Sequence, residues 1–261
     1  MKGTRVDLEE YLARIGAARP GRPDLAALRE LQWRHLTSVP FENLGRFLGE
    51  RPDLDEPALL DKIVRRRRGG LCYELNGAFA LLLTKIGFRV RLLAGRVLRR
   101  TGTWGPPLDH LALRVDLDEP WLVDVGFGRF CALPLRFGAA GPQRDPAGVF
   151  TVRPTAHGDV ELTHDGTVIY RLETRPRELG DFAAMAWYHA NSPDSPFAAG
   201  PTCSLATPGG RVTIAGDRLI ETTGGERVET VLAGDALAAT YRERFGISLD
   251  QISLQQLIVT E

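Results

Sequence analysis

The hydrophobic pattern of this chain changes its period at Gly87. In residues 72–86 the apolar side chains recur every three or four positions, which marks one face of an α-helix. A glycine directly after such a stretch is a common helix stop. From residue 88 the apolar side chains alternate with arginines, which is typical of a strand with one buried face. Helices before this point and strands after it predict an α+β fold.

The first third of the chain is expected to form four short helices. Asp7 and Glu10 have the spacing of a capping box, and Pro23 suits the first turn of the second helix. The compact connections indicate a helical bundle. The four expected segments are 7–16, 23–39, 55–64 and 72–86.

The rest of the chain reads mainly as strands. A hairpin turning at residues 118–120 joins the expected strands 110–117 and 121–125, and Asp165-Gly166 marks the tip of another. The expected strands are 88–97, 110–117, 121–125, 149–152, 159–164, 167–171, 211–214, 218–222 and 227–232. Helices are expected at 182–191, 235–245 and 251–258.

The composition excludes several classes of protein. Lys+Arg and Asp+Glu both total 33 among 261 residues, so no global field would recruit nucleic acid or an anionic membrane. No stretch approaches the ~20 apolar residues of a membrane span, and no apolar run follows the N-terminus as in a signal peptide. The three cysteines are far apart, and no Cys/His cluster has metal-ligand spacing. We therefore expect a cytoplasmic enzyme or binding protein without a metal.

Cys72 stands at the predicted start of a helix, directly after Gly69 and Gly70 bring the backbone to a tight turn. The unpaired N–H groups and the dipole of a helix start favour an anion, and the thiolate is the reactive form of cysteine. This position suits a nucleophile. Cysteine is also a common small buried residue, so packing alone explains the turn equally well at this stage.

His110 and Asp124 follow Cys72 in the order of a papain-like site, with the nucleophile on a helix and the other two on strands. An imidazole takes the thiol proton, and a carboxylate holds the imidazole in the required tautomer. Both residues are expected on one face of the hairpin. Simple pairing places His110 opposite Gly128, ~13 Å along the strand from Asp124, so a bulge, twist or different turn must bring them together.

Other residues compete for these two roles. Asp109 is a rival carboxylate, but as the neighbour of His110 it is expected on the opposite face. His35 is expected on a helix surface, while His157 and His164 fall in turn-rich loops. His189 falls in the short helix 182–191.

Several motifs in this order resemble the arylamine N-acetyltransferases. They are 40–44 (PFENL), 68–76 (RGGLCYELN), His110, 124–128 (DVGFG) and 192–197 (SPDSPF). The resemblance implies a helical bundle over residues 1–87, an antiparallel β-barrel over 88–180 and an α/β lid over 181–261. It also implies that an acetyl group passes from acetyl-CoA to Cys72 and then to an aromatic amine or hydrazine.

The resemblance also assigns roles to single residues, beginning with Cys72, His110 and Asp124 as a catalytic triad. The family lines its acceptor pocket with aromatic residues, here at Phe41, Phe127 and Phe197. The pantetheine of the cofactor approaches the backbone at two glycines, here Gly126 and Gly128.

The resemblance also implies a buried supporting pair, formed here by Glu42 and Arg68. Family members vary at the positions of Arg129 and Cys131.

Three alternatives to acetyl transfer remain open from the sequence. An amide synthase that closes a macrolactam from a carrier-bound polyketide would keep the same triad. A papain-like cysteine hydrolase would use the same order of residues, and a binding protein could retain a site without activity. The expected partners are small molecules, with a monomer and a homo-oligomer both left open.

Overall fold

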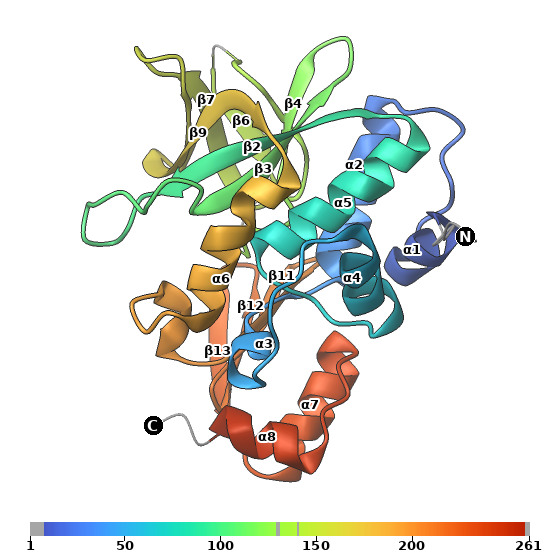
Figure 1. Ribbon diagram of the computed structural model, residues 1–261, viewed down its shortest axis with the longest axis vertical. Helices are drawn as coiled ribbons and strands as arrows, with labels where there is room; N and C mark the ends of the chain where they lie inside the picture. Colours follow the sequence, from blue (N-terminus) through green and yellow to red (C-terminus); the bar gives the residue numbers. More distant parts are fainter. Residues whose placement is uncertain (1–7, 129–130, 140, 259–261) are drawn as a thin grey trace.

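The computed structural model describes residues 8–128, 131–139 and 141–258 (Figure 1). Helices of the first third lie beside a barrel of antiparallel strands, and a second sheet with two helices lies below them in this view. The predicted α+β class, with a helical first part, a barrel and a mixed C-terminal part, is confirmed. Within the described ranges, no helix is both long enough and apolar enough to cross a membrane.

The helices agree with the periodicity of the sequence to within about two residues at their ends, and the fourth begins at Cys72 as expected. The second begins at Leu25 rather than Pro23, because the Asp24 carboxylate caps it by accepting the Ala27 N–H at 2.9 Å. The capping role expected of Asp7 lies outside the described residues. The helices are α1 (Leu8–Ile15), α2 (Leu25–Ser38), α3 (Leu44–Phe47), α4 (Glu56–Leu60), α5 (Cys72–Ile86), α6 (Ala183–Asn191), α7 (Asp235–Phe245) and α8 (Gln251–Ile258). The helix expected at 55–64 continues beyond α4 as the π-helical segment η1 (Asp61–Arg65). Two single turns are η2 (Leu179–Phe182) and η3 (Pro196–Ala199), and neither α3 nor η3 was predicted.

The barrel is one antiparallel sheet in the order β5-β4-β3-β2-β9-β8-β7-β6. Its strands are β2 (Arg89–Val97), β3 (His110–Asp116), β4 (Pro120–Val123), β5 (Leu135–Arg136), β6 (Gln143–Asp145), β7 (Gly148–Pro154), β8 (Val160–His164) and β9 (Thr167–Arg177). The predicted hairpin tip at Asp165-Gly166 is confirmed, with φ angles of 47° and 80°. The short strands β5 and β6 carry too few residues to show an alternating pattern.

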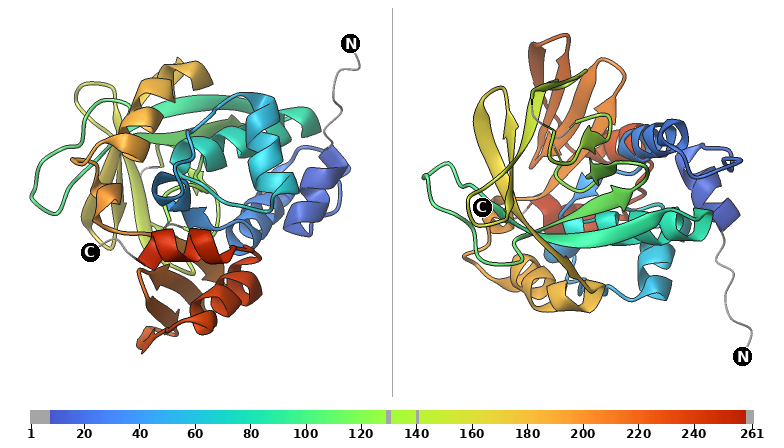
Figure 2. Two further views of the ribbon diagram at one scale, coloured as in Figure 1. Left: turned by 60° about the horizontal axis from the view of Figure 1, so that its bottom comes forward. Right: turned by 90° about the horizontal axis from the view of Figure 1, so that it is seen from above.

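The second sheet joins distant parts of the chain. Its order is β1-β10-β11-β12-β13, from β1 (Phe41–Glu42), β10 (Thr202–Thr207), β11 (Gly210–Ala215), β12 (Arg218–Thr223) and β13 (Glu226–Val231). Figure 2 shows α7 and α8 together on one side of this sheet, where they share an apolar cluster with it. The first third therefore contributes a strand to the C-terminal sheet.

Helix α5 is the central element. Eleven of its residues are buried, from Cys72 to Leu83, and the helix packs against β2 and β3 on one side and against α1 and α4 on others. Gly87 ends it with a φ of 111°, as the sequence predicts. The start of α5 thus meets the barrel at the end of β4, near β1 of the second sheet.

Candidate active site

Gly69 and Gly70 are required by close approach of the backbone and not by their conformation. Neither has a positive φ; the left-handed residue of this turn is Arg67, with φ 53°. A Cβ on Gly69 would lie 1.8 Å from the Pro40 carbonyl oxygen, and one on Gly70 would lie 2.5 Å from Glu74 Oε2. The expectation that the glycines form the turn itself is therefore wrong. They allow the chain to press against β1 and against the start of α5.

Glu74 holds the start of α5 in place. Its Oε2 accepts the Leu71 N–H at 2.9 Å, which satisfies one of the free donors of a helix start. Its Oε1 accepts a hydrogen bond from Lys62 Nζ at 2.7 Å, and both side chains are largely buried. The backbone directly before Cys72 is therefore fixed by a buried ion pair.

Glu42 and Arg68 form the supporting pair that the sequence suggests. Arg68 Nε donates to Glu42 Oε1 at 3.0 Å, while Arg68 Nη1 donates to Glu50 Oε1 at 3.0 Å. Burial alone would raise the pKa of Glu42, but Arg68 and Lys62 outweigh it and lower that pKa. Glu42 lies in the short strand β1, and its N–H donates to the Gly70 carbonyl at 3.0 Å.

Asp124 sits at the centre of the candidate site and is fully buried. Its Oδ1 accepts hydrogen bonds from Asn76 Nδ2 and from the Gly126 N–H, both at 2.9 Å. Its Oδ2 lies 2.7 Å from His110 Nε2 and accepts the Tyr170 hydroxyl at 3.1 Å. With four donors around it, the carboxylate is held in one orientation.

The hairpin register explains how His110 reaches Asp124. The three-residue loop covers residues 117–119, one position earlier than expected, because Asp116 pairs with Pro120 and Leu113 with Val123. Extending this register places residue 124 beside Ala112, two residues from His110 on the same face. The predicted pairing of His110 with Gly128 is therefore wrong by two residues, and the earlier turn halves the expected gap.

The two neighbours of His110 raise its pKa. Burial would lower its pKa, but the Asp124 carboxylate and Cys72, both hydrogen-bonded to the ring, raise that pKa from 6.5 to about 10. Since Nε2 faces Asp124, the nitrogen left for the thiol is Nδ1. The structure thus brings Cys72, His110 and Asp124 together in the order that the sequence suggests.

Gly126 lies against Cys72. A Cβ at this position would be 2.6 Å from the Cys72 Cα and 2.7 Å from Asn76 Nδ2, so any side chain would push the two elements apart. Gly128 has a φ of 81°, and its Cα faces the ring of Phe41. Both glycines are needed for the fold of this turn, whatever approaches it from outside.

Aromatic rings surround the imidazole and the turn. Phe127 meets the His110 ring edge-on with centroids 5.3 Å apart, and Tyr170 lies 5.0 Å from the same ring. Phe41 and Phe197 have ring centroids 5.9 Å apart although they are far apart in the sequence. The three phenylalanines singled out from the sequence are all half-buried, as residues that line a pocket would be.

The rival histidines and Asp109 lie outside this group. His35 is fully buried and not on a helix surface, with Nε2 3.1 Å from the Tyr11 hydroxyl; burial and Arg14 lower its pKa to about 3. His157 is exposed, and His164 contacts the Ala147 carbonyl on the barrel surface. Asp109 faces away from His110, as expected, and lies beside His189.

Two site residues were missed by sequence reasoning. Asn76 donates to Asp124 and to the Leu111 carbonyl, and its Oδ1 accepts the Val125 N–H at 2.9 Å. Its position four residues after Cys72, on the same helix face, was an available signal. Tyr170 comes from β9, and no local pattern links it to the site. Cys131 is buried, and Arg129 lies outside the described residues.

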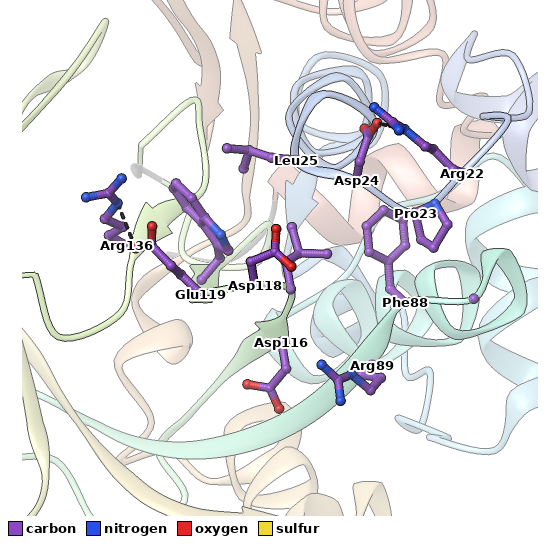
Figure 3. Close-up of a pocket in the computed structure, with 13 residues that line it drawn as sticks. Arg22, Pro23, Asp24, Leu25, Phe88, Arg89, Asp116, Asp118, Glu119 and Arg136 are labelled. Carbon is purple, nitrogen blue, oxygen red and sulfur yellow. Dashed lines mark hydrogen bonds and ion pairs between the residues drawn. The ribbon is translucent and has the colours of Figure 1, made fainter.

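The surface pocket of Figure 3 is a different place. Cys72, His110 and Asp124 are not among the described residues that line this pocket. Two ion pairs lie in it: Arg22 pairs with Asp24 at 2.6 Å, and Arg136 pairs with Glu119 at 3.0 Å. Across the described ranges, no group of three acidic, histidine or cysteine side chains is arranged to hold a metal ion.

Comparison with known proteins gives one consistent result. Residues 24–254 match the family described as N-acetyltransferase. An arylamine N-acetyltransferase of Mycolicibacterium smegmatis is 36% identical, with 95% of this chain and 94% of that protein covered. The structure of a Salmonella typhimurium arylamine N-acetyltransferase matches with a TM-score of 0.90 at 30% identity, over 97% of this chain and 98% of that one. A Mycobacterium marinum arylamine N-acetyltransferase solved in complex with CoA matches with a TM-score of 0.88 at 30% identity, over the same shares of each chain. This chain, an acyltransferase, belongs to the arylamine N-acetyltransferase family.

Proposed function

We propose that the protein moves an acetyl group from acetyl-CoA to the nitrogen of an arylamine or hydrazine through a thioester on Cys72. The observation that carries the proposal is the contact of His110 with both Cys72 and Asp124 at the start of α5. A related protein binds CoA in its crystal structure, which supports acetyl-CoA as the donor.

In the first half-reaction His110 holds the proton of the Cys72 thiol on Nδ1. The Cys72 thiolate attacks the thioester carbonyl of acetyl-CoA, and the tetrahedral oxyanion is met by backbone N–H groups at the start of α5. The C–S bond to CoA then breaks, and the CoA thiolate takes the proton from His110. Both the donor and the acyl-enzyme are thioesters, so little free energy separates them.

In the second half-reaction the amine attacks the acetyl-Cys72 carbonyl. His110 accepts a proton from the amine nitrogen, and the C–S bond to Cys72 breaks to release the amide. Asp124 keeps Nε2 as a donor and stabilises the charged imidazole in both steps. Such a sequence has ping-pong kinetics, because the first product leaves before the amine reacts.

The surroundings of Cys72 suit these two substrates. Phe127, Phe41 and Phe197 offer aromatic faces to the ring of an arylamine. Gly126 and Gly128 present bare backbone to the narrow pantetheine arm. Glu42 and Arg68 would keep the 69–70 segment in register with β1.

We propose a division of labour between the three parts of the chain. Residues 1–87 carry the nucleophile, residues 88–180 carry the base and its carboxylate, and residues 181–261 cover the site as a lid. The cysteines at 72, 131 and 203 are all free, which suits a reducing compartment such as the cytoplasm.

Intact-mass measurement after incubation with acetyl-CoA alone tests the proposal. We expect one added acetyl group on Cys72, absent in Cys72→Ala and retained in Cys131→Ser, and released by a panel of arylamines and hydrazines. An acetyl group lost rapidly in buffer without amine would point to a hydrolase. An acetyl-enzyme that no small amine discharges would favour an amide synthase, and no adduct at all would refute the transfer.

A further inference from the structure

A second buried carboxylate–imidazole pair lies beside the candidate site. His189 Nε2 is 3.2 Å from Asp109 Oδ1, and both side chains are 1% exposed. Arg99 Nη2 donates to the same oxygen at 2.6 Å. Burial would raise the pKa of Asp109, but His189 and Arg99 outweigh it and keep the carboxyl ionised. The proposed transfer chemistry uses none of these three residues.

The other side of the imidazole holds the turn that carries Phe197. His189 Nδ1 lies 3.1 Å from Ser195 Oγ, and Ser195 Oγ accepts the Phe197 N–H at 3.2 Å. Ser195 is the cap of the single turn η3. The rings of His189 and Phe197 also meet edge-on, with centroids 5.1 Å apart. His189 thus contacts both the backbone anchor and the side chain of this turn.

Ser195 joins the imidazole to its own backbone. The Ser195 hydroxyl donates to the His189 carbonyl at 3.2 Å, and that carbonyl also accepts from Arg46 Nη1 at 3.2 Å. The imidazole faces Ser195 Oγ through Nδ1 and the Asp109 carboxylate through Nε2. Arg99, Asp109, His189 and Ser195 then form one connected strut.

The strut reaches from the base of β3 to both sides of the candidate site. His189 stacks on Tyr73, the residue after Cys72, with planes 22° apart and centroids 6.0 Å apart. Phe197 in turn packs against Phe41. A shift of His189 would therefore move the aromatic wall of the pocket while leaving the His110–Asp124 bond intact.

We propose that His189 is a positioning residue that sets the place of Phe197 and thereby decides which arylamines the pocket accepts. The proposal rests on the function proposed above, since it needs Phe197 to line the acceptor pocket. Its ligand is the aromatic ring of the amine, and the acetyl donor is unaffected.

Three substitutions at residue 189 separate the contacts. His189→Phe keeps the ring contacts and loses both nitrogens; His189→Gln can place an amide nitrogen where Nε2 faces Asp109; His189→Asn can place one where Nδ1 faces Ser195. Each variant is measured for acetyl-Cys72 formation from acetyl-CoA, and for KM and kcat with aniline and with the larger 1-aminonaphthalene. His157→Phe, at an exposed turn, is the control.

We expect His189→Phe to raise KM for aniline about tenfold, the worth of one lost hydrogen bond in the anchor of the wall. Acetyl-Cys72 formation and kcat should stay within about twofold, because only ground-state binding of the amine is lost. The ratio of kcat/KM for the two amines should change as well. His189→Gln or His189→Asn should recover part of the KM, and the control should match wild type.

Two results would overturn the inference. One is unchanged KM and unchanged amine preference in all three variants. The other is an equal fall of both half-reactions that neither Gln nor Asn relieves, which would mark a general structural role. If His189→Phe fails to fold, Ser195→Ala cuts the strut at its far end and is judged by the same measurements. Absence of acetyl-Cys72 in wild type would refute the transfer itself and this inference with it.

Discussion

Two carboxylate–imidazole pairs lie back to back in this protein, and they begin at adjacent residues. His110 points to Asp124 on one face of β3, while Asp109 points to His189 on the other. All four side chains are buried, and both carboxylates are surrounded by donors. The pairs differ in the group on the remaining ring nitrogen. In one it is a thiol at the start of a fifteen-residue helix; in the other it is a hydroxyl that already caps a single turn.

This difference shows what a catalytic triad requires beyond its hydrogen bonds. Ser195 Oγ accepts the Phe197 N–H and donates to the His189 carbonyl, so its hydroxyl is already engaged in holding a single short turn. Cys72 stands where the N–H groups of α5 can stabilise negative charge on sulfur or on an oxyanion. A carboxylate and an imidazole orient a third group, but the position of that group determines whether it can react.

The comparison is tested most strongly by removing the third member of each assembly. Cys72→Ala should lower kcat/KM by about 10⁴-fold or more, because the covalent route is lost. Ser195→Ala should leave acetyl-Cys72 formation within about tenfold of wild type, since it affects only the anchoring of Phe197. Steady-state rates and intact mass measure both. A comparable collapse in Ser195→Ala would mean that the two assemblies are not distinct in role.

The next largest difference between the two assemblies is expected when each carboxylate is replaced by an uncharged amide. Because Asp124 and Cys72 raise the pKa of His110 to about 10, the imidazolium persists at neutral pH and favours the thiolate beside it. In protein with Cys131→Ser and Cys203→Ser, Cys72 should alkylate rapidly well below pH ~8.5, where an ordinary thiol begins to react. Asp124→Asn should lower this low-pH reactivity by about a hundredfold, since the lost carboxylate charge no longer stabilises the His110 imidazolium beside the thiolate.

Asp109→Asn is the matched variant for that experiment. It should leave the pH profile of alkylation at Cys72 unchanged, because its carboxylate faces His189. A profile that rises only near pH ~8.5 in wild type would show that no ion pair exists at rest. His110 would then act only with substrate bound.

The buried ion pair that supports the first assembly should contribute more to the free energy of unfolding than the half-exposed Arg66 near it. Arg68→Ala strands Glu42 in the core beneath the Cys72 turn and should lower the free energy of unfolding by about 3–5 kcal/mol. Arg66→Ala, next to it but half exposed, should cost less than about 1 kcal/mol. Chemical denaturation measures the difference. Equal effects would mean that the Glu42–Arg68 pair does not hold the turn.

The smallest expected effect is the stability change in Ser195→Ala. Loss of the cap of η3 should cost about 1 kcal/mol, the typical worth of an N-cap side chain. Thermal unfolding compares it with Ser192→Ala, whose hydroxyl accepts only the Asp194 N–H at the surface. A loss as large as that of Arg68→Ala would show that the strut supports the whole fold and not one turn.

Local patterns were sufficient to predict most elements and the faces of the strands. The periodicity gave α5 and β3, and the alternation of faces separated Asp109 from His110. What failed depended on contacts between distant segments. The role of Gly69 is set by Pro40, the burial of His35 by Tyr11, and the orientation of Asp124 by Tyr170. The register predicted at His110 was wrong because the turn begins one residue earlier than expected. The alternation of side chains alone does not determine where a turn begins.

The strand β1 has a consequence for how the protein is made. Glu42 reaches the turn before Cys72, but β1 pairs with Cys203 and Ser204, and Asn43 bonds to Phe197, Gly200 and Thr202. More than a hundred and fifty residues of chain separate the two partners of these bonds. A ribosome must therefore synthesise most of the protein before the site can close. Until then the thiol that will carry the acetyl group stays on an unfinished and unprotected turn.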